Sequence, residues 1–190
     1  MALKPITGPG SEPVPLDEAK AQCRVEHSAE DSLITSLIAV ARAEAERELG
    51  RALFTQTWEA VYDAFPCAEI ELGKPPVQLI TSVTYIDTAG ATQVLSGAAY
   101  TLDADRDPGW CLPAHGYTWP TTLNTANAVR VRFVSGWASV ESIPEPIKHW
   151  IKVRVATLHK FREAIAAGVS VTTLGDRFTD RLLDPWRVHS

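Results

Sequence analysis

The hydrophobic pattern of this chain changes its period twice, and these changes constrain its fold more than any other feature. Residues 28–50 place apolar side chains three and four positions apart, the spacing of one helical face. After Gly50 the spacing becomes two in the apolar segments up to residue 134, and from Pro144 the helical spacing returns. Strands grouped between helices, rather than alternating with them, indicate an α+β fold and argue against a Rossmann or barrel enzyme.

The helix expected over residues 28–50 carries its own start and stop signals. The hydroxyl of Ser28 can accept the backbone N–H of Asp31, and Gly50 stands where a left-handed residue ends a helix. A shorter helix is expected over residues 15–23, and the last long helix over residues 144–167. None of these helices carries a catalytic signature.

The segments between the helices predict an antiparallel β-layer over residues 55–134. Residues 55–62 alternate with Trp58, Ala60 and Tyr62 on one face, and residues 69–72 are expected to return beside them as a hairpin. Further strands are expected at residues 77–86, 91–95, 99–102, 110–112 and 128–134. In the last of these, Val129, Val131 and Phe133 are expected to point inward.

Three parts of the chain follow from this pattern. Residues 1–14 are rich in proline and glycine and are predicted to form an extended arm rather than a packed element. Residues 15–168 form the main domain, and residues 169–190 form an extended C-terminal tail.

Composition excludes several classes of protein. The net charge of −5 argues against a general nucleic-acid binder, because such a protein needs a basic stripe. The N-terminal residues lack the apolar core of a signal peptide, and no apolar run has the length of a membrane span. Three distant cysteines fit a reduced chain without a disulfide framework.

No motif nominates an active site, a metal or a cofactor. The run from Asp103 to Asp107 resembles the start of a calcium loop, but Pro108 and Ala114 occupy the positions that need glycine and a bidentate acid. A solvated loop is therefore favoured there, with weak cation binding as the alternative. The five histidines lack zinc-ligand spacing, and the common nucleotide-binding and hydrolase motifs do not occur.

Two surfaces are candidates for contacts between subunits. Arg42, Glu46 and Arg47 lie on the polar face of the central helix, and Lys148 and Lys152 lie on the last helix. These two faces could meet head to tail, the geometry that closes rings; the alternative is an ordinary solvated face.

The loop over residues 103–127 is expected to project from the β-layer and to contact a neighbour through Trp110, Tyr117 and Trp119. The alternative is that Trp119 is an ordinary core residue.

Taken in order, the motifs of residues 14–165 resemble those of tailed-phage head–tail connector proteins. The resemblance is to the longer members of that family, which insert strands between the helices, and it extends to the adaptors of gene transfer agents. The motifs that carry the resemblance are Pro15-Leu16-Asp17-Glu18-Ala19-Lys20, Glu30-Asp31-Ser32-Leu33-Ile34, the run from Ala43 to Leu53, Gln56-Thr57-Trp58, Pro76-Val77, Val83-Thr84-Tyr85-Ile86-Asp87 with Gly90, Tyr100-Thr101-Leu102, Trp119-Pro120, residues 127–133 with Gly136, and Ile143-Pro144-Glu145-Pro146-Ile147-Lys148.

The resemblance implies a structural virion protein at the head–tail interface, assembled in the host cytoplasm and without enzymatic activity or cofactor. Such proteins form a ring, usually a dodecamer, beneath the portal protein, and they continue the DNA channel with only passive contact to DNA. A tail-side stopper or terminator protein would be the second partner. The open alternatives are another virion ring component, such as a stopper or tail terminator, and, from a different class, a small hydrolase.

The C-terminal tail departs from the shorter members of that family and is expected to dock on the portal. A short tail cannot bury several large apolar side chains within itself, so they need another surface. That surface is either the subunit's own core or the portal, with the arginines fixing orientation in the second case. The residues concerned are Phe178, Leu182, Leu183, Trp186, Arg181 and Arg187.

Overall fold

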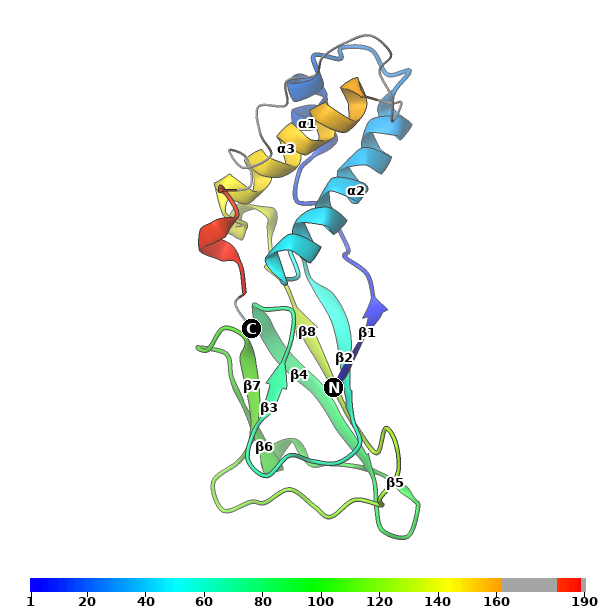
Figure 1. Ribbon diagram of the computed structural model, residues 1–190, viewed down its shortest axis with the longest axis vertical. Coiled ribbons are helices and arrows are strands. Elements are labelled where there is room, and N and C mark those ends of the chain that lie inside the picture. Colours follow the sequence, from blue (N-terminus) through cyan, green and yellow to red (C-terminus); the bar gives the residue numbers. More distant parts are fainter. Residues whose placement is uncertain (162–180, 189–190) are drawn as a thin grey trace. The chain divides into compact units, whose positions relative to one another are not determined.

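The computed structural model describes residues 1–161 and 181–188, which fold into two compact units. Among these residues, the helical unit contains 11–53, 138–161 and 181–188, and the β unit contains 1–10 and 54–137. Over the described residues, three α-helices and two antiparallel sheets confirm the α+β class predicted from the sequence (Figure 1). The inserted strands, together with the first ten residues, make a unit of their own.

The helical unit is built from α1 (Leu16–Cys23), α2 (Asp31–Leu49) and α3 (Glu145–Lys160). α2 buries the face that its spacing predicts, and Gly50 ends it with a φ of 71°. α3 buries Ile147, Trp150, Ile151 and Val155. The side chains that α2 buries are Ile34, Ile38, Ala41, Ala45 and Leu49.

The start of α2 differs from the prediction. The residue before its first turn is Glu30, without a side-chain cap, and the backbone carbonyl of Ser28 accepts the N–H of Asp31 at 3.2 Å. The prediction that the hydroxyl of Ser28 caps this helix is therefore wrong. Instead, the carboxylate of Asp31 binds the ammonium of Lys20 at 2.6 Å, which joins α1 to α2.

α3 ends at Lys160, earlier than the predicted residue 167. The backbone N–H of Phe161 still bonds to the carbonyl of Thr157, but the φ of Phe161 has left the helical region. The predicted face residue Ile165 and the predicted stop at Gly168 lie outside the described residues.

The β unit consists of a five-stranded sheet of order β1-β2-β8-β4-β5 and a three-stranded sheet of order β3-β7-β6. The first sheet contains β1 (Ala2–Thr7), β2 (Gln56–Tyr62), β4 (Val77–Ile86), β5 (Thr92–Val94) and β8 (Val129–Ser135). The second sheet contains β3 (Ile70–Leu72), β6 (Tyr100–Asp103) and β7 (Gly109–Pro113). All adjacent strands are antiparallel.

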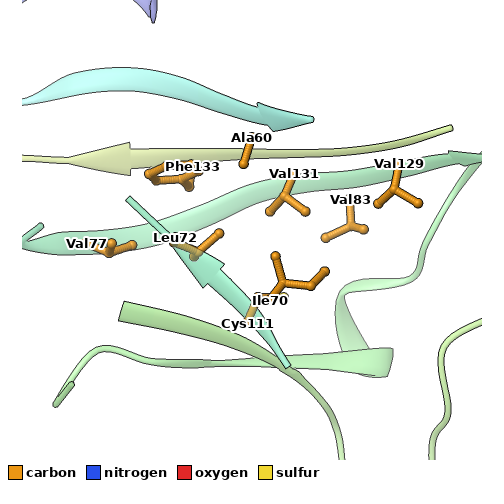
Figure 2. Close-up of a cluster of buried hydrophobic side chains, with 9 residues drawn as sticks. All are labelled: Ala60, Ile70, Leu72, Val77, Val83, Cys111, Val129, Val131 and Phe133. Carbon is orange, nitrogen blue, oxygen red and sulfur yellow. The ribbon is translucent and has the colours of Figure 1, made fainter. Parts of the chain in front are cut away.

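The core of the β unit lies between the two sheets, as Figure 2 shows. Strand alternation explains it, because every second side chain of a strand points to the same face. The predicted inward positions of β2 and β8 are confirmed, with Trp58 and Tyr62 packed at the margin of the cluster. The buried members are Ala60, Ile70, Leu72, Val77, Val83, Cys111, Val129, Val131 and Phe133.

Two strands correct the sequence prediction. Residues 2–7 are extended, as expected of an arm, but they pair with β2 as an edge strand. Pro5 fits there, because an edge strand can leave one side of its backbone without a sheet partner. Residues 70–72 do not form a hairpin with β2; they pair with β7 in the second sheet, because β1 and β8 already occupy both edges of β2.

Candidate interaction surfaces

The polar face of α2 is held largely by ion pairs within the subunit. The guanidinium of Arg42 binds Glu12 at 2.8 Å and Glu46 at 2.8 Å. Glu46 also accepts the backbone N–H of Leu53 at 2.9 Å, so it fixes the chain after the helix. These pairs are partly buried, and they give Arg42 and Glu46 a structural task in their own subunit.

The basic side chains of α3 are likewise paired with acids of the helical unit. Lys148 lies 2.5 Å from Glu145, and Lys152 lies 3.0 Å from Glu18 of α1. Arg154 binds the carboxylate of Glu44 with two nitrogens, the closer at 2.5 Å. Of the five residues predicted for a ring interface, Arg47 remains the most exposed, with 75% of its side chain accessible and Glu48 at 3.3 Å.

The loop residues occupy three different environments. Tyr117 is 52% exposed, and Trp110 lies half-buried on the outer face of the three-stranded sheet. Trp119 is half-buried and stacks on Phe65 with ring centroids 4.9 Å apart. Its indole N–H donates to the carbonyl of Ala68 at 2.9 Å. Trp119 is thus attached to the core of its own unit, which favours the core alternative for this residue.

Replacing Trp119 with alanine is expected to destabilise the β unit by about 2 kcal/mol, because the stacked ring and its buried area are lost. Tyr117→Ala, two positions earlier on an exposed site, is the matched control and should change stability by less than about 0.5 kcal/mol. Urea unfolding followed by tryptophan fluorescence measures both. If the two variants were equally stable, Trp119 would not stabilise its own subunit and would again be a candidate for contact with a neighbour.

The described part of the C-terminal tail is packed on the helical unit. Leu183 is completely buried, and the backbone N–H of Val188 donates to the carbonyl of Leu49 at 2.9 Å. The carbonyl of Trp186 accepts from the guanidinium of Arg51. Of the two alternatives for the tail, these contacts support the subunit's own core for Leu183.

The other tail residues divide by exposure. Leu182 and Trp186 are half-buried, and Arg187 lies 3.6 Å from Asp184 and 3.9 Å from Glu48. Arg181 is exposed. Phe178 lies outside the described residues.

The outer face of the five-stranded sheet carries a charged cluster that sequence reasoning missed. Glu59 of β2, with 8% of its side chain exposed, receives Arg130 and Arg132 of β8 at 2.9 Å each. Burial alone would raise the pKa of Glu59, but hydrogen bonds and charge from Arg132 and Arg130 outweigh it and lower the pKa below its usual value of 4.5. The alternating pattern Arg130-Val131-Arg132 was the available signal, since it places both arginines on the face opposite the core.

One pocket and one acidic loop among the described residues are candidate places for chemistry, and neither gathers a catalytic set of side chains. A pocket of about 330 Å³ opens beside β4, β5 and β8 and is lined by residues such as Thr84, Thr92, Asn127 and Arg130. It brings no nucleophile together with a base. In the Asp103–Asp107 loop, Asp103 is bound to Arg106 at 3.0 Å, and within the described chain no group of three metal-binding side chains gathers.

Comparison with known proteins finds a similarity to one protein family. Residues 14–89 match the model of the phage gp6-like head–tail connector protein family. No protein of curated function matches the chain. Over these residues the match confirms the resemblance predicted from the sequence.

Solved structures share the fold over the full length. A chain in the neck of an empty GTA particle, computed with C6 symmetry, is 22% identical, with a TM-score of 0.79. A chain in the virion of a native gene transfer agent particle is 21% identical, with a TM-score of 0.80. A chain in the neck of the native particle, computed with C12 symmetry, is 22% identical, with a TM-score of 0.70. Each alignment covers 100% of this chain and 97% of the other.

Across the described residues, no helix combines the length and the apolar character that crossing a lipid bilayer requires.

Proposed function

We propose that this protein is a head–tail connector that forms a ring in the neck of a phage or gene transfer agent particle, beneath the portal. The ring joins the capsid to the tail and continues the DNA channel. The observation that carries the proposal is the match of residues 14–89 to the connector family within a fold that is similar over the full chain to chains of GTA necks. The C6 and C12 symmetries of those necks support a ring of twelve copies for this chain too.

The predicted ring and portal surfaces fit this role with fewer contact residues than the sequence suggested. Arg47 is the most exposed of the five predicted ring residues and is the best helical candidate for a subunit contact. The other four, Arg42, Glu46, Lys148 and Lys152, stabilise their own subunit. At the C-terminus, Arg181 is exposed and can bind acidic groups of the portal without disturbing buried Leu183. The ring continues on its far side to a stopper or terminator protein.

The test is negative-stain microscopy and light scattering of the purified protein, alone and with purified portal. Rings that bind the portal, and not isolated tail tube, are expected. A protein that stays monomeric under both conditions contradicts the proposal. Rings that bind tail tube but not the portal would identify a tail-side component instead.

A further inference from the structure

The two outer faces of the β unit carry opposite charge. On the five-stranded sheet, Lys4, Glu59 and Arg132 stand opposite one another across β1, β2 and β8. Arg130 lies on the same face, two residues before Arg132. Lys4 is exposed, and the two arginine side chains are 43% and 44% exposed. This basic face therefore sets three cations against the one carboxylate of Glu59.

The basic face retains unused binding capacity. Each arginine donates a hydrogen bond to one oxygen of Glu59. A guanidinium has five N–H donors, so several remain for a partner. Because Glu59 is nearly buried between them, it holds the arginines in place and reduces the ordering that a partner must impose.

The outer face of the three-stranded sheet is acidic and has an aromatic centre. Trp110 stands between Asp103 and Glu71 in the register of β6, β7 and β3. Arg106 lies over the ring of Trp110 and binds both Asp103 and Glu69. Glu71 is exposed between the buried Ile70 and Leu72. This acidic face sets Glu69, Glu71 and Asp103 against the single cation of Arg106.

These faces point in opposite directions, because the core side chains of both sheets lie between them (Figure 2). We infer that the basic face of one copy binds the acidic face of the next copy in the ring. A contact between two different faces of the same chain is heterologous, and repeating it closes a ring when the rotation from copy to copy adds up to a full turn. Trp110 is the central anchor of the contact, and the charges on its rim fix the orientation.

A second copy fits the basic face better than DNA does. Glu59 cancels part of the positive charge, whereas binding to phosphates depends on several uncompensated cations. The complementary acidic face is also present on the same unit, so each copy carries both halves of the contact. The inference rests on the proposed ring and names the surfaces that close it.

The experiment inverts each face separately. The first variant carries Lys4→Glu, Arg130→Gln and Arg132→Gln; the glutamines keep hydrogen-bond donors beside Glu59 while removing the positive charge. The second carries Glu69→Gln, Glu71→Lys and Asp103→Asn, which keeps acceptors for Arg106. Alone, each variant should need at least about tenfold higher concentration to form rings, because like charges then face each other.

An equimolar mixture of the two variants should restore rings in which the copies alternate, because each inverted face meets an inverted partner. Rings are counted by electron microscopy, and mass photometry measures the concentration at which they form. If the wild type forms rings and neither variant changes the concentration at which they form, the inference is overturned and the proposed function still stands. Absence of wild-type rings, alone and on the portal, overturns the proposed function itself.

Two further outcomes are decisive. Normal rings of the first variant, with lost binding of a fluorescent DNA duplex, would assign the basic face to DNA instead. If either triple variant fails to fold by circular dichroism, the single variants Lys4→Glu and Glu71→Lys replace them. Both sites are exposed, so their substitution should leave folding intact, and the same rescue by mixing is expected. Failure of that rescue contradicts the inference.

Discussion

Replacing Gly136 with alanine should destabilise the β unit by roughly 3 kcal/mol or more. Gly136 follows β8 with a φ of +103°, a conformation that side chains other than glycine's strongly disfavour. A Cβ atom there would lie 2.1 Å from the backbone oxygen of Phe54 and 2.4 Å from its carbonyl carbon. Both neighbours are backbone atoms, so a rotamer change cannot relieve the clash.

The backbone of Gly136 also fixes the ends of neighbouring strands. Its N–H donates to the carbonyl of Pro76 at 2.8 Å, and its carbonyl accepts the side-chain amide of Gln78 at 2.6 Å. A shift that removes the clash with Phe54 would strain these bonds at the start of β4. The cost therefore includes lost hydrogen bonds as well as an unfavourable backbone conformation.

Gly97→Ala is the matched control. Gly97 belongs to the same unit, its φ lies outside the disfavoured range, and a Cβ added there would meet no atom within 4 Å. Its substitution should change stability by less than about 1 kcal/mol and can raise it, since alanine restricts the unfolded chain. Urea unfolding of both variants makes the comparison. Similar midpoints for the two would show that the chain around Gly136 rearranges readily.

Periodicity in the sequence was sufficient to predict the elements with one buried face. The spacing of α2 identified its buried residues, and the alternation of β8 identified Val129, Val131 and Phe133. In both cases burial repeats with the period of the backbone, so a single segment carries the information. The changes of period along the chain also gave the order of the elements, and the structure confirmed the class of fold.

The pairing of strands that are distant in the sequence was harder to predict. Residues 70–72 alternate as a strand should, but nothing within them distinguishes β2 from β7 as a partner. Residues 2–7 were obscured by Pro5 and by the run Gly8-Pro9-Gly10 that follows them, because an edge strand tolerates a proline that usually indicates an unpaired arm.

The same limit applies to the candidate surfaces. Charged residues on a helix look available until their partners are known, and the partners of Lys152 and Arg154 lie more than a hundred positions away in the chain. Such ion pairs depend on the packing of α1 and α2 against α3. Arg47 could be separated from Arg42 only once the contacts of Arg42 with Glu12 were visible.

The C-terminal tail gives the second large effect. Leu183→Ala should destabilise the helical unit by about 3 kcal/mol, because a fully buried leucine is replaced by a cavity. The exposed neighbour Arg181 supplies the control, since Arg181→Ala should alter stability by less than about 0.5 kcal/mol. Thermal and urea unfolding measure both changes.

Portal binding should depend on the other of these two residues: substitution of Arg181 should weaken it, and substitution of Leu183 should not. Arg181→Glu removes a cation that can bind acidic portal groups and should weaken portal capture while the unfolding midpoint stays unchanged. Leu183→Ala should lower the midpoint, and capture by the portal should be retained at temperatures where the variant is folded. Deletion of the whole tail would mix these effects, because the Val188–Leu49 and Arg51–Trp186 bonds are lost together with Arg181. If Leu183→Ala melts like the wild type, the buried position of Leu183 does not stabilise the subunit in solution, and the tail would then be free to reach the portal with its apolar residues.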